Sequence, residues 1–292
     1  MLELIEASAA QLEAAGLTFE NGFGQGTTNA FDEAAWLVMW QLGLPLDDLD
    51  SVQKMPVAQA ERAQVATLLG ARISTRQPAA YLTHEAWLMG VSFYVDERVI
   101  IPRSFIAELL VDESIDPWLG EDTRRVLDLC TGNGSLAVLA AMTYPDVLVD
   151  AADISLDALA VARINVDKHA LGSRITLIES DGLAACHGLT NGGYDLILCN
   201  PPYVNAASMA ALPAEFKAEP ALALGGGSDG MDFIRSLFLT AAAQMNENAV
   251  LVLEIGNERE NFERAFPQLE PLWFETSAGS DQVMLITREQ LV

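Results

Sequence analysis

The feature that most limits the fold is a regular alternation of apolar runs and helical stretches that begins near residue 105. The apolar runs read as strands, and helical stretches such as 157–169 and 232–245 stand between most of them. This alternation is typical of a parallel sheet with helices on both faces. We expect strands at 125–129, 147–152, 175–179, 194–199 and 249–255, and an added strand at 282–287.

The chain before residue 85 has a helical pattern instead. Leu2, Ile5, Ala9 and Leu12 recur at the spacing of one helix face. Between residues 85 and 104, two short apolar runs separated by a glycine turn indicate a β-hairpin or an extended linker. The sequence therefore predicts a small helical domain at 1–84, a linker at 85–104 and an α/β domain at 105–292.

The charge of the chain is strongly acidic. Sixteen basic and 41 acidic residues give a net charge of -25. Such a field repels the phosphates of nucleic acids and favours basic partners. A role of the acidity in solubility alone is an equally open interpretation, so charge counts against direct nucleic-acid reading without identifying a partner.

The cysteines and the amino-terminus indicate a cytoplasmic protein. The three cysteines, Cys130, Cys186 and Cys199, are an odd number without zinc-ligand spacing, which fits a reducing compartment. Residues 1–10 contain two glutamates and no lysine or arginine, unlike a signal peptide. No apolar run approaches the length that crosses a membrane. His84, His169 and His187 also form no ligand spacing, so we expect no metal site.

A glycine loop follows the first predicted strand of the α/β domain. Gly132 and Gly134 let a ligand approach the backbone, and the helix that starts there carries partial positive charge. Gly132-x-Gly134-x-x-Ala137, with Asp153 nineteen residues after Gly134, also fits a dinucleotide-binding fingerprint. A nicotinamide site, an S-adenosyl-L-methionine site and a plain strand-turn-helix therefore all remain open on the loop alone.

Asp128 favours one of these cofactors. It stands inside an apolar strand, where an unpaired carboxylate is costly. A nicotinamide cofactor brings its pyrophosphate to this loop, so a carboxylate has no role there. S-adenosylmethionine instead brings an ammonium group and a sulfonium, which a buried carboxylate stabilises directly or through the loop. The sequence thus favours a methyltransferase over a dehydrogenase.

The tetrapeptide Asn200-Pro201-Pro202-Tyr203 follows the strand expected at 194–199, at the sheet edge that forms the ligand crevice. An amide nitrogen is a poor nucleophile because its lone pair is delocalised. The side-chain oxygen of Asn200 and the backbone oxygen of Pro201 can hold its two N–H groups and aim the nitrogen at a methyl donor. The prolines fix those acceptors, and Tyr203 can pack on the flat amide. A rigid turn at a strand end is the alternative.

With these motifs in order, the chain resembles the HemK-like glutamine methyltransferases, and most closely those of the PrmB type. The resemblance covers almost the whole chain. Arg103-Ser104 favours the PrmB type over the release-factor type. The matching stretches are 26–30, 80–82, 93–98, 101–104, the glycine loop, 153–155, 200–203, 219–220, 228–230, 254–257 and 287–291.

The resemblance implies a helical domain that recognises the target, a β-hairpin linker and a seven-stranded Rossmann-like S-adenosylmethionine-dependent methyltransferase domain. It implies that Asn200 to Tyr203 hold a glutamine of a basic protein of the large ribosomal subunit. Phe105 and Gly182 depart from the pattern of many relatives. The cofactor contacts that the resemblance implies are Cys130, Thr131, Gly132, Asn133, Gly134, Asp153, Asp181 or Gly182, and Asn200.

Other functions stay open at this point. The same chemistry could act on a peptide chain release factor, and enzymes that methylate the adenine amino group of DNA share the tetrapeptide. A non-catalytic cofactor-binding or ribosome-assembly protein is the alternative from another class. The net charge of -25 counts against the DNA enzyme.

Four further features have weaker functional claims. Glu254 ends an apolar strand and is expected to orient a loop or the substrate, and a structural ion pair is favoured at least equally. Glu219 is expected to be solvated or to stabilise a loop, with a contact to the target or to Lys217 as the alternative, and Arg103 to anchor the linker. The glycine run 225–227 predicts a flexible loop, with a lid as the alternative.

Overall fold

The computed structural model describes residues 1–19, 21–23, 26–186 and 192–292. Within these residues a seven-stranded sheet has the order β5-β4-β3-β6-β7-β9-β8. The strands β3 to β7 are parallel, and β9 is antiparallel to both of its neighbours. This confirms the predicted α/β fold class. The strands are β3 (Arg125–Leu129), β4 (Leu148–Asp153), β5 (Ile175–Glu179), β6 (Tyr194–Cys199), β7 (Met245–Glu254), β8 (Leu272–Trp273) and β9 (Val283–Thr287).

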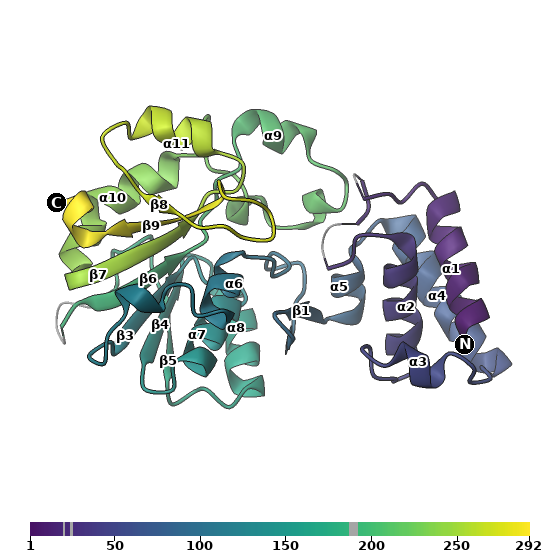
Figure 1. The fold of residues 1–292 in the computed structure, drawn as a ribbon. Helices are drawn as coiled ribbons and strands as arrows, with labels where there is room; N and C mark the ends of the chain where they lie inside the picture. The colour runs from purple at the N-terminus through teal and green to yellow at the C-terminus, as the bar shows by residue number, and fades with distance from the viewer. Residues whose placement is uncertain (20, 24–25, 187–191) are drawn as a thin grey trace.

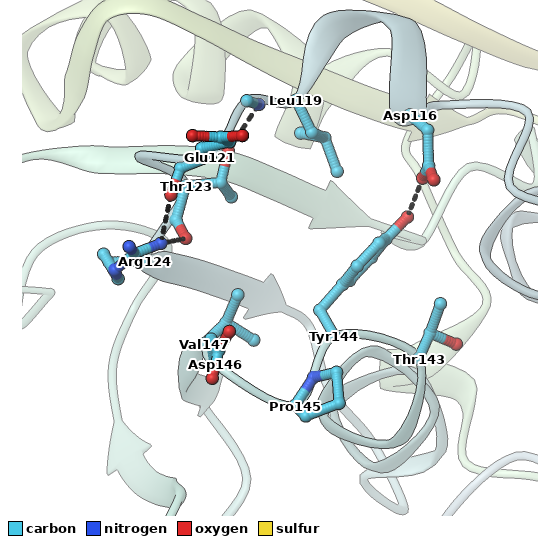
Figure 2. A pocket seen from close by; sticks show the side chains of 11 residues that line it. Asp116, Leu119, Glu121, Thr123, Arg124, Thr143, Tyr144, Pro145, Asp146 and Val147 are labelled. Carbon is cyan, nitrogen blue, oxygen red and sulfur yellow. Dashed lines mark hydrogen bonds between the residues drawn. The ribbon is translucent and has the colours of Figure 1, made fainter.

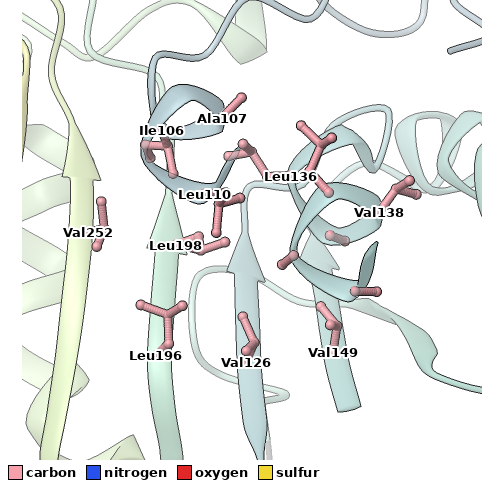
Figure 3. Close-up of a cluster of buried hydrophobic side chains, with 14 of the residues drawn as sticks. Ile106, Ala107, Leu110, Val126, Leu136, Val138, Val149, Leu196, Leu198 and Val252 are labelled. Atoms are coloured by element: carbon pink, nitrogen blue, oxygen red, sulfur yellow. The ribbon is translucent and has the colours of Figure 1, made fainter. Parts of the chain in front are cut away.

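Helices cover both faces of this sheet because its strands are apolar on both sides. On β3, Val126 faces one buried cluster, while Leu127 and Leu129 face the other. Figure 3 shows Ile106 and Leu110 of one covering helix lying over the β6 strand. The first face is covered by α6 (Ile106–Val111), α7 (Ser135–Thr143) and α8 (Leu156–Lys168), and the second by α10 (Asp232–Gln244) and α11 (Arg259–Ala265).

The amino-terminal part is a separate group of helices with its own apolar cluster (Figure 1). Ile5, Leu12, Leu37 and Leu69 are each at most 2% exposed in that cluster. The Asn29 side chain caps the second helix by accepting from the backbone N–H of Asp32 at 2.9 Å. The helices are α1 (Leu2–Ala14), α2 (Ala30–Gln41), α3 (Leu49–Val52), α4 (Gln59–Thr75) and α5 (Ala79–Thr83).

A hairpin and an extended segment join the two parts. The hairpin pairs β1 (Ala86–Leu88) with β2 (Val91–Phe93). Asn165 of α8 fixes the segment that follows: its side chain accepts from the Tyr94 N–H at 2.7 Å and donates to the Tyr94 carbonyl at 3.0 Å. The bounds 1–84, 85–104 and 105–292 for the domains remain a prediction.

Short elements complete the chain, and most of them lie near the carboxyl ends of the strands. Among the described residues, no helix is both long and apolar enough to span a bilayer. The short elements are η1 (Asp116–Trp118), α9 (Ala206–Ala211), η2 (Phe216–Ala218), η3 (Ala221–Ala223) and η4 (Arg288–Leu291).

Candidate active site

The carboxyl ends of β3, β4, β5 and β6 surround a cavity of about 240 Å³, which we call the cofactor cavity. Backbone hydrogen bonds join the strand ends: the Thr131 N–H donates to the Ala152 carbonyl at 3.0 Å, and the Ser180 N–H donates to the Asp153 carbonyl at 2.9 Å. The structure thereby brings most of the sequence-predicted residues together. Those that line the cavity are Cys130, Gly132, Asp153, Asp181, Gly182, Asn200 and Pro202.

The glycine loop offers its backbone to this cavity. Gly132 has φ +54°, and a Cβ added there would meet nothing within 4 Å. The Gly132 N–H donates to Asp153 Oδ2 at 2.9 Å, and Asp153 Oδ1 accepts from the Ser155 N–H at 2.9 Å. Asp153 thus holds the loop while its carboxylate lines the cavity.

Asp128 lies behind the loop and does not line the cavity. Its Oδ2 accepts from Thr131 Oγ1 at 2.5 Å and from the Ala137 N–H at 2.9 Å, so it ties the loop to the first turn of α7. Its Oδ1 is buried without a hydrogen-bond partner among the described residues. Burial raises the pKa of the Asp128 carboxyl to about 7. Its influence on a ligand therefore passes through the loop.

Two other predicted loop residues also serve the fold around the cavity. Asn133 is buried, and its carbonyl accepts from the Asn165 side chain at 2.9 Å. A Cβ on Gly134 would lie 3.2 Å from the Cβ of Ala162, which brings α7 close to α8. Thr131, Asn133 and Gly134 thus lie in the loop but not in the cavity lining.

The residues of the cofactor cavity fit S-adenosylmethionine. The Asp153 and Asp181 carboxylates can accept hydrogen bonds from the hydroxyl groups of a ligand. Together with buried Asp128, they favour a ligand that carries positive charge. Apolar side chains such as Ile100, Leu222 and Phe233 complete the lining and suit a flat base. The open space beside Gly132 leaves room for a ligand against the backbone.

A second cavity of about 140 Å³, which we call the acceptor cavity, meets the first at Asn200. Asn200, Ile100 and Ala223 line both cavities. Pro202 faces the cofactor cavity, whereas Pro201 and Tyr203 line the acceptor cavity. The tetrapeptide thus separates two spaces and places Asn200 at their junction.

Glu254, at the end of β7, supports the tetrapeptide and the linker together. It is 2% exposed and accepts from Ser104 Oγ at 2.6 Å, from the Phe105 N–H at 2.9 Å and from the Tyr203 hydroxyl at 3.4 Å. Burial raises the pKa of the Glu254 carboxyl to about 7. These contacts match the expected loop-orienting role, whereas the equally favoured ion pair does not occur among the described residues.

The glycine run 225–227 is packed against the tetrapeptide rather than extended into solvent. The Gly226 N–H donates to the Val204 carbonyl at 2.9 Å, and the Val204 N–H donates to the Leu224 carbonyl at 2.8 Å. A Cβ on Gly226 would lie 2.7 Å from the Pro202 carbonyl oxygen. Gly226 is buried, which contradicts the expected flexible loop at this position. The close approach of the neighbouring backbone explains why a glycine stands here.

The linker contributes residues that the sequence did not single out. Arg98, Val99 and Ile100 line the cofactor cavity, and Arg98 forms an ion pair with Asp96 at 2.5 Å. Their route past the glycine loop depends on Asn165, seventy-one residues from Tyr94. Only the resemblance at 93–98 gave a signal for this segment.

His84 and His169 each lie close to a backbone carbonyl oxygen. His84 Nδ1 lies 3.3 Å from the Val95 carbonyl oxygen, and His169 Nε2 lies 3.0 Å from that of Ser92. His187 lies outside the described residues. No group of three or more metal-ligating side chains occurs in the part of the chain that the structure describes.

Another hollow of about 280 Å³ lies at the other end of the sheet (Figure 2). It is lined by residues next to the amino end of β3 and after α7, and the Tyr144 hydroxyl donates to Asp116 at 2.8 Å beside it. None of the residues that the sequence selected lines it. The candidate site is therefore at the carboxyl ends of the strands.

Comparison with known proteins gives a consistent result. The family model "Methyltransferase small domain" matches residues 107–228. A protein of Bordetella pertussis named ribosomal protein uL3 glutamine methyltransferase is 50% identical, over 99% of this chain and 95% of that protein. A protein of the same name from Neisseria meningitidis serogroup A is 51% identical, over 92% of this chain and 88% of its own.

A solved structure supports the fold alone. The catalytic domain of human METTL16, in complex with an RNA hairpin, is 14% identical to this chain, covers 78% of it and 81% of its own length, and has a TM-score of 0.51. At that identity the likeness extends to the arrangement of the sheet and helices.

Proposed function

The chain belongs to the ribosomal protein uL3 glutamine methyltransferases, and from that membership we propose that it methylates a glutamine side-chain amide of ribosomal protein uL3. It is an S-adenosylmethionine-dependent enzyme. The observation that carries the proposal is the junction of two cavities at Asn200. A methyl donor in one cavity and a methyl acceptor in the other then meet at Asn200, whose side chain can form a hydrogen bond with an amide.

The cofactor cavity is proposed to hold S-adenosylmethionine, which supplies a methyl group on a positively charged sulfur. The loop 130–134 presents backbone to it, with Asp128 holding the loop from behind. Asp153 and Asp181 accept from hydroxyl and amino groups, and Gly182 leaves space beside them. Apolar side chains such as Ile100 and Phe233 line the rest of the cavity, and a lower local dielectric constant strengthens polar contacts beside them.

The acceptor cavity is proposed to hold the glutamine side chain. Asn200 Oδ1 and the Pro201 carbonyl accept the two amide N–H groups, so the nitrogen lone pair points toward the cofactor cavity. Tyr203, held by Glu254, packs against the flat amide. Such positioning of two reactants can lower the activation free energy by up to roughly 7–11 kcal/mol. No strong general base is needed, because the nitrogen sheds its proton after it has become cationic.

The acidic charge supports a basic protein partner rather than nucleic acid. Residues 1–84 are proposed to contribute to recognition of uL3. A ribosomal-protein substrate also supports a cytoplasmic place of action.

Transfer of labelled methyl from S-adenosylmethionine to recombinant uL3 tests the proposal. We expect one labelled glutamine, and no label when that glutamine is replaced by alanine. Parallel reactions contain a release factor or duplex DNA in place of uL3 as the alternative acceptor. Label in either of them, with none in uL3, would contradict the proposal.

The Asn200→Ala variant tests the chemistry of the junction. It should lose about a hundredfold or more in kcat, comparable to the loss when one preorganised hydrogen-bonding group is removed from a reacting centre. Its affinity for S-adenosylhomocysteine, measured by calorimetry, should change much less, because most cavity contacts remain. Wild-type turnover in this variant would refute the assigned role of Asn200.

A further inference from the structure

We propose that the helical amino-terminal part sets the outer wall of the acceptor cavity through Glu215, and so positions the acceptor as well as recognising it. This inference rests on the proposed function for its kinetic consequence. The acceptor wall is defined as residues 212–224, which follow the tetrapeptide in the chain. Its physical basis is a buried charge cluster between two parts of the molecule.

The acceptor wall forms one side of the acceptor cavity. Leu212, Phe216, Ala223 and Leu224 all line that cavity. The wall contains only the short elements η2 and η3, so no long helix or strand fixes it. One backbone hydrogen bond, from the Val204 N–H to the Leu224 carbonyl, holds its far end, and side-chain anchors position the rest.

The first anchor is Glu215, which enters the helical part and is 1% exposed. Its Oε1 forms an ion pair with Arg76 Nε at 2.7 Å and accepts a hydrogen bond from Arg72 Nη1 at 3.3 Å. Arg72 is fully buried; its Nε donates to Glu33 at 2.8 Å, and its Nη2 donates to the Gly22 carbonyl at 2.5 Å. Two arginines and two glutamates thus form a neutral cluster.

The second anchor is Glu219, which faces the linker. It is 4% exposed and accepts from both terminal nitrogens of Arg103, at 2.6 and 2.7 Å, and from the Ile101 N–H at 3.0 Å. Phe216, between the anchors, lies over the Arg103 guanidinium at 5.3 Å. The wall is therefore held on both sides of Phe216, on one side by the helical part and on the other by the linker.

The buried charges around Glu215 favour one position of the acceptor wall relative to the helical part. Removing one partner of a buried ion pair leaves the other without compensation, so the cluster favours one relative position of wall and helices. The cofactor cavity, in contrast, has no lining residue from the helical part. The wall residues that reach it, Pro220, Leu222 and Ala223, all follow the second anchor, Glu219. A change at Glu215 should thus affect the acceptor more than the cofactor.

The kinetic test replaces Glu215 by glutamine, which keeps the shape and removes the charge. We expect the KM for uL3 to rise roughly tenfold, kcat to change less, and the Kd for S-adenosylhomocysteine to stay within about twofold. Asp150→Asn is the matched control, because it weakens the part-buried Arg125–Asp150 pair at the other end of the sheet. The control should leave the KM unchanged.

A second readout does not depend on uL3. The chain has three lysines, Lys54, Lys168 and Lys217, all exposed, and Lys217 lies in the acceptor wall. A lysine-specific protease should cut after Lys217 faster in Glu215→Gln than in the wild type, while the cuts after Lys54 and Lys168 keep their rates. Unchanged cleavage after Lys217 would overturn the inference.

The two readouts separate this inference from the proposed function. If wild-type protein does not methylate uL3 but Glu215→Gln exposes Lys217, the function is wrong and the anchor stands. If uL3 is methylated and the variant keeps its KM, the inference fails while the function stands. A parallel loss of cofactor affinity would mean general unfolding and would also overturn it.

Discussion

Glu254 joins the linker, the tetrapeptide and β7 through one buried carboxyl group. Its pKa of about 7 lies above the ordinary value of 4.5 because it is buried. The folded protein therefore binds a proton more tightly than the unfolded chain does. The contribution of Glu254 to the free energy of unfolding should fall as the pH rises from about 4.5 to about 7, and no further loss from this group is expected above that range.

Glu254→Gln should remove this contribution to the pH dependence. Relative to wild type, the variant should gain stability between about pH 5 and pH 8, by on the order of 3 kcal/mol. Urea unfolding at both pH values measures the gain. Glu263→Gln, at an exposed glutamate of α11, is the control and should show no gain. An equal pH slope in Glu254→Gln and wild type would contradict this account.

Gly256 makes room for Tyr203. A Cβ at Gly256 would lie 2.5 Å from the Tyr203 ring, at a backbone φ of +52°. Gly256→Ala should therefore displace Tyr203 and lower kcat by roughly tenfold to a hundredfold, because small misplacements at a reacting centre are costly.

The control for this substitution is Gly43→Ala. Gly43 has φ +64°, so it shares the backbone strain, but a Cβ there meets nothing within 4 Å. Stopped-time methylation assays and thermal unfolding of both variants should show a similar loss of stability and a kcat loss in Gly256→Ala alone. Equal kcat losses would mean that strain, not the Tyr203 contact, is responsible.

At the scale of elements, the linker brings Arg98 into the lining of the cofactor cavity, where it is the one basic side chain among the described residues. The guanidinium of Arg98 uses Nε and Nη2 to bind Asp96. Its remaining N–H groups can donate to the carboxylate of S-adenosylmethionine, the only anionic group of that cofactor. The linker would then be part of the cofactor site.

Arg98→Met should weaken the binding of S-adenosylmethionine by roughly tenfold, the worth of a charge-assisted hydrogen bond. The binding of its decarboxylated analogue should change little. Calorimetry with both ligands gives the comparison, and Arg163→Met, at an exposed position of α8, is the control. Equal weakening for both ligands would exclude a contact with the carboxylate.

Most of the sheet was predictable from the sequence because buried parallel strands are continuous apolar runs. The strands expected at 125–129, 175–179 and 194–199 have those bounds in the structure. The two-residue strand β8 was missed because such a short run has no period, and β7 starts at Met245 because pairing extends it beyond its apolar core.

The site was predictable where it follows strand ends and unpredictable where it depends on distant partners. The glycine loop and the tetrapeptide end neighbouring strands, so the topology brings them together. The acceptor wall has no periodic pattern. Its contact between Arg72 and Glu215 spans 143 residues of sequence, and no local signal reports such a pair.

At the scale of the whole molecule, the net charge of -25 should attract a basic partner over a distance set by salt. Raising the salt from about 0.05 M to about 0.3 M should lower kcat/KM for uL3 severalfold by slowing association. The Kd for S-adenosylhomocysteine, measured in the same buffers, should change much less. A kcat/KM that does not change with salt would show that the acidic surface has no part in the association of the enzyme with uL3.

The small acceptor cavity also restricts when the target can be modified. With the glutamine in the acceptor cavity, as proposed, a space of about 140 Å³ between the tetrapeptide and the acceptor wall has room for a side chain and leaves the target's main chain outside. On this proposal, the glutamine projects freely from its own protein at the moment of reaction. Once neighbouring subunit components pack around that residue, no approach is left, so we expect methylation to come before the burial of its target.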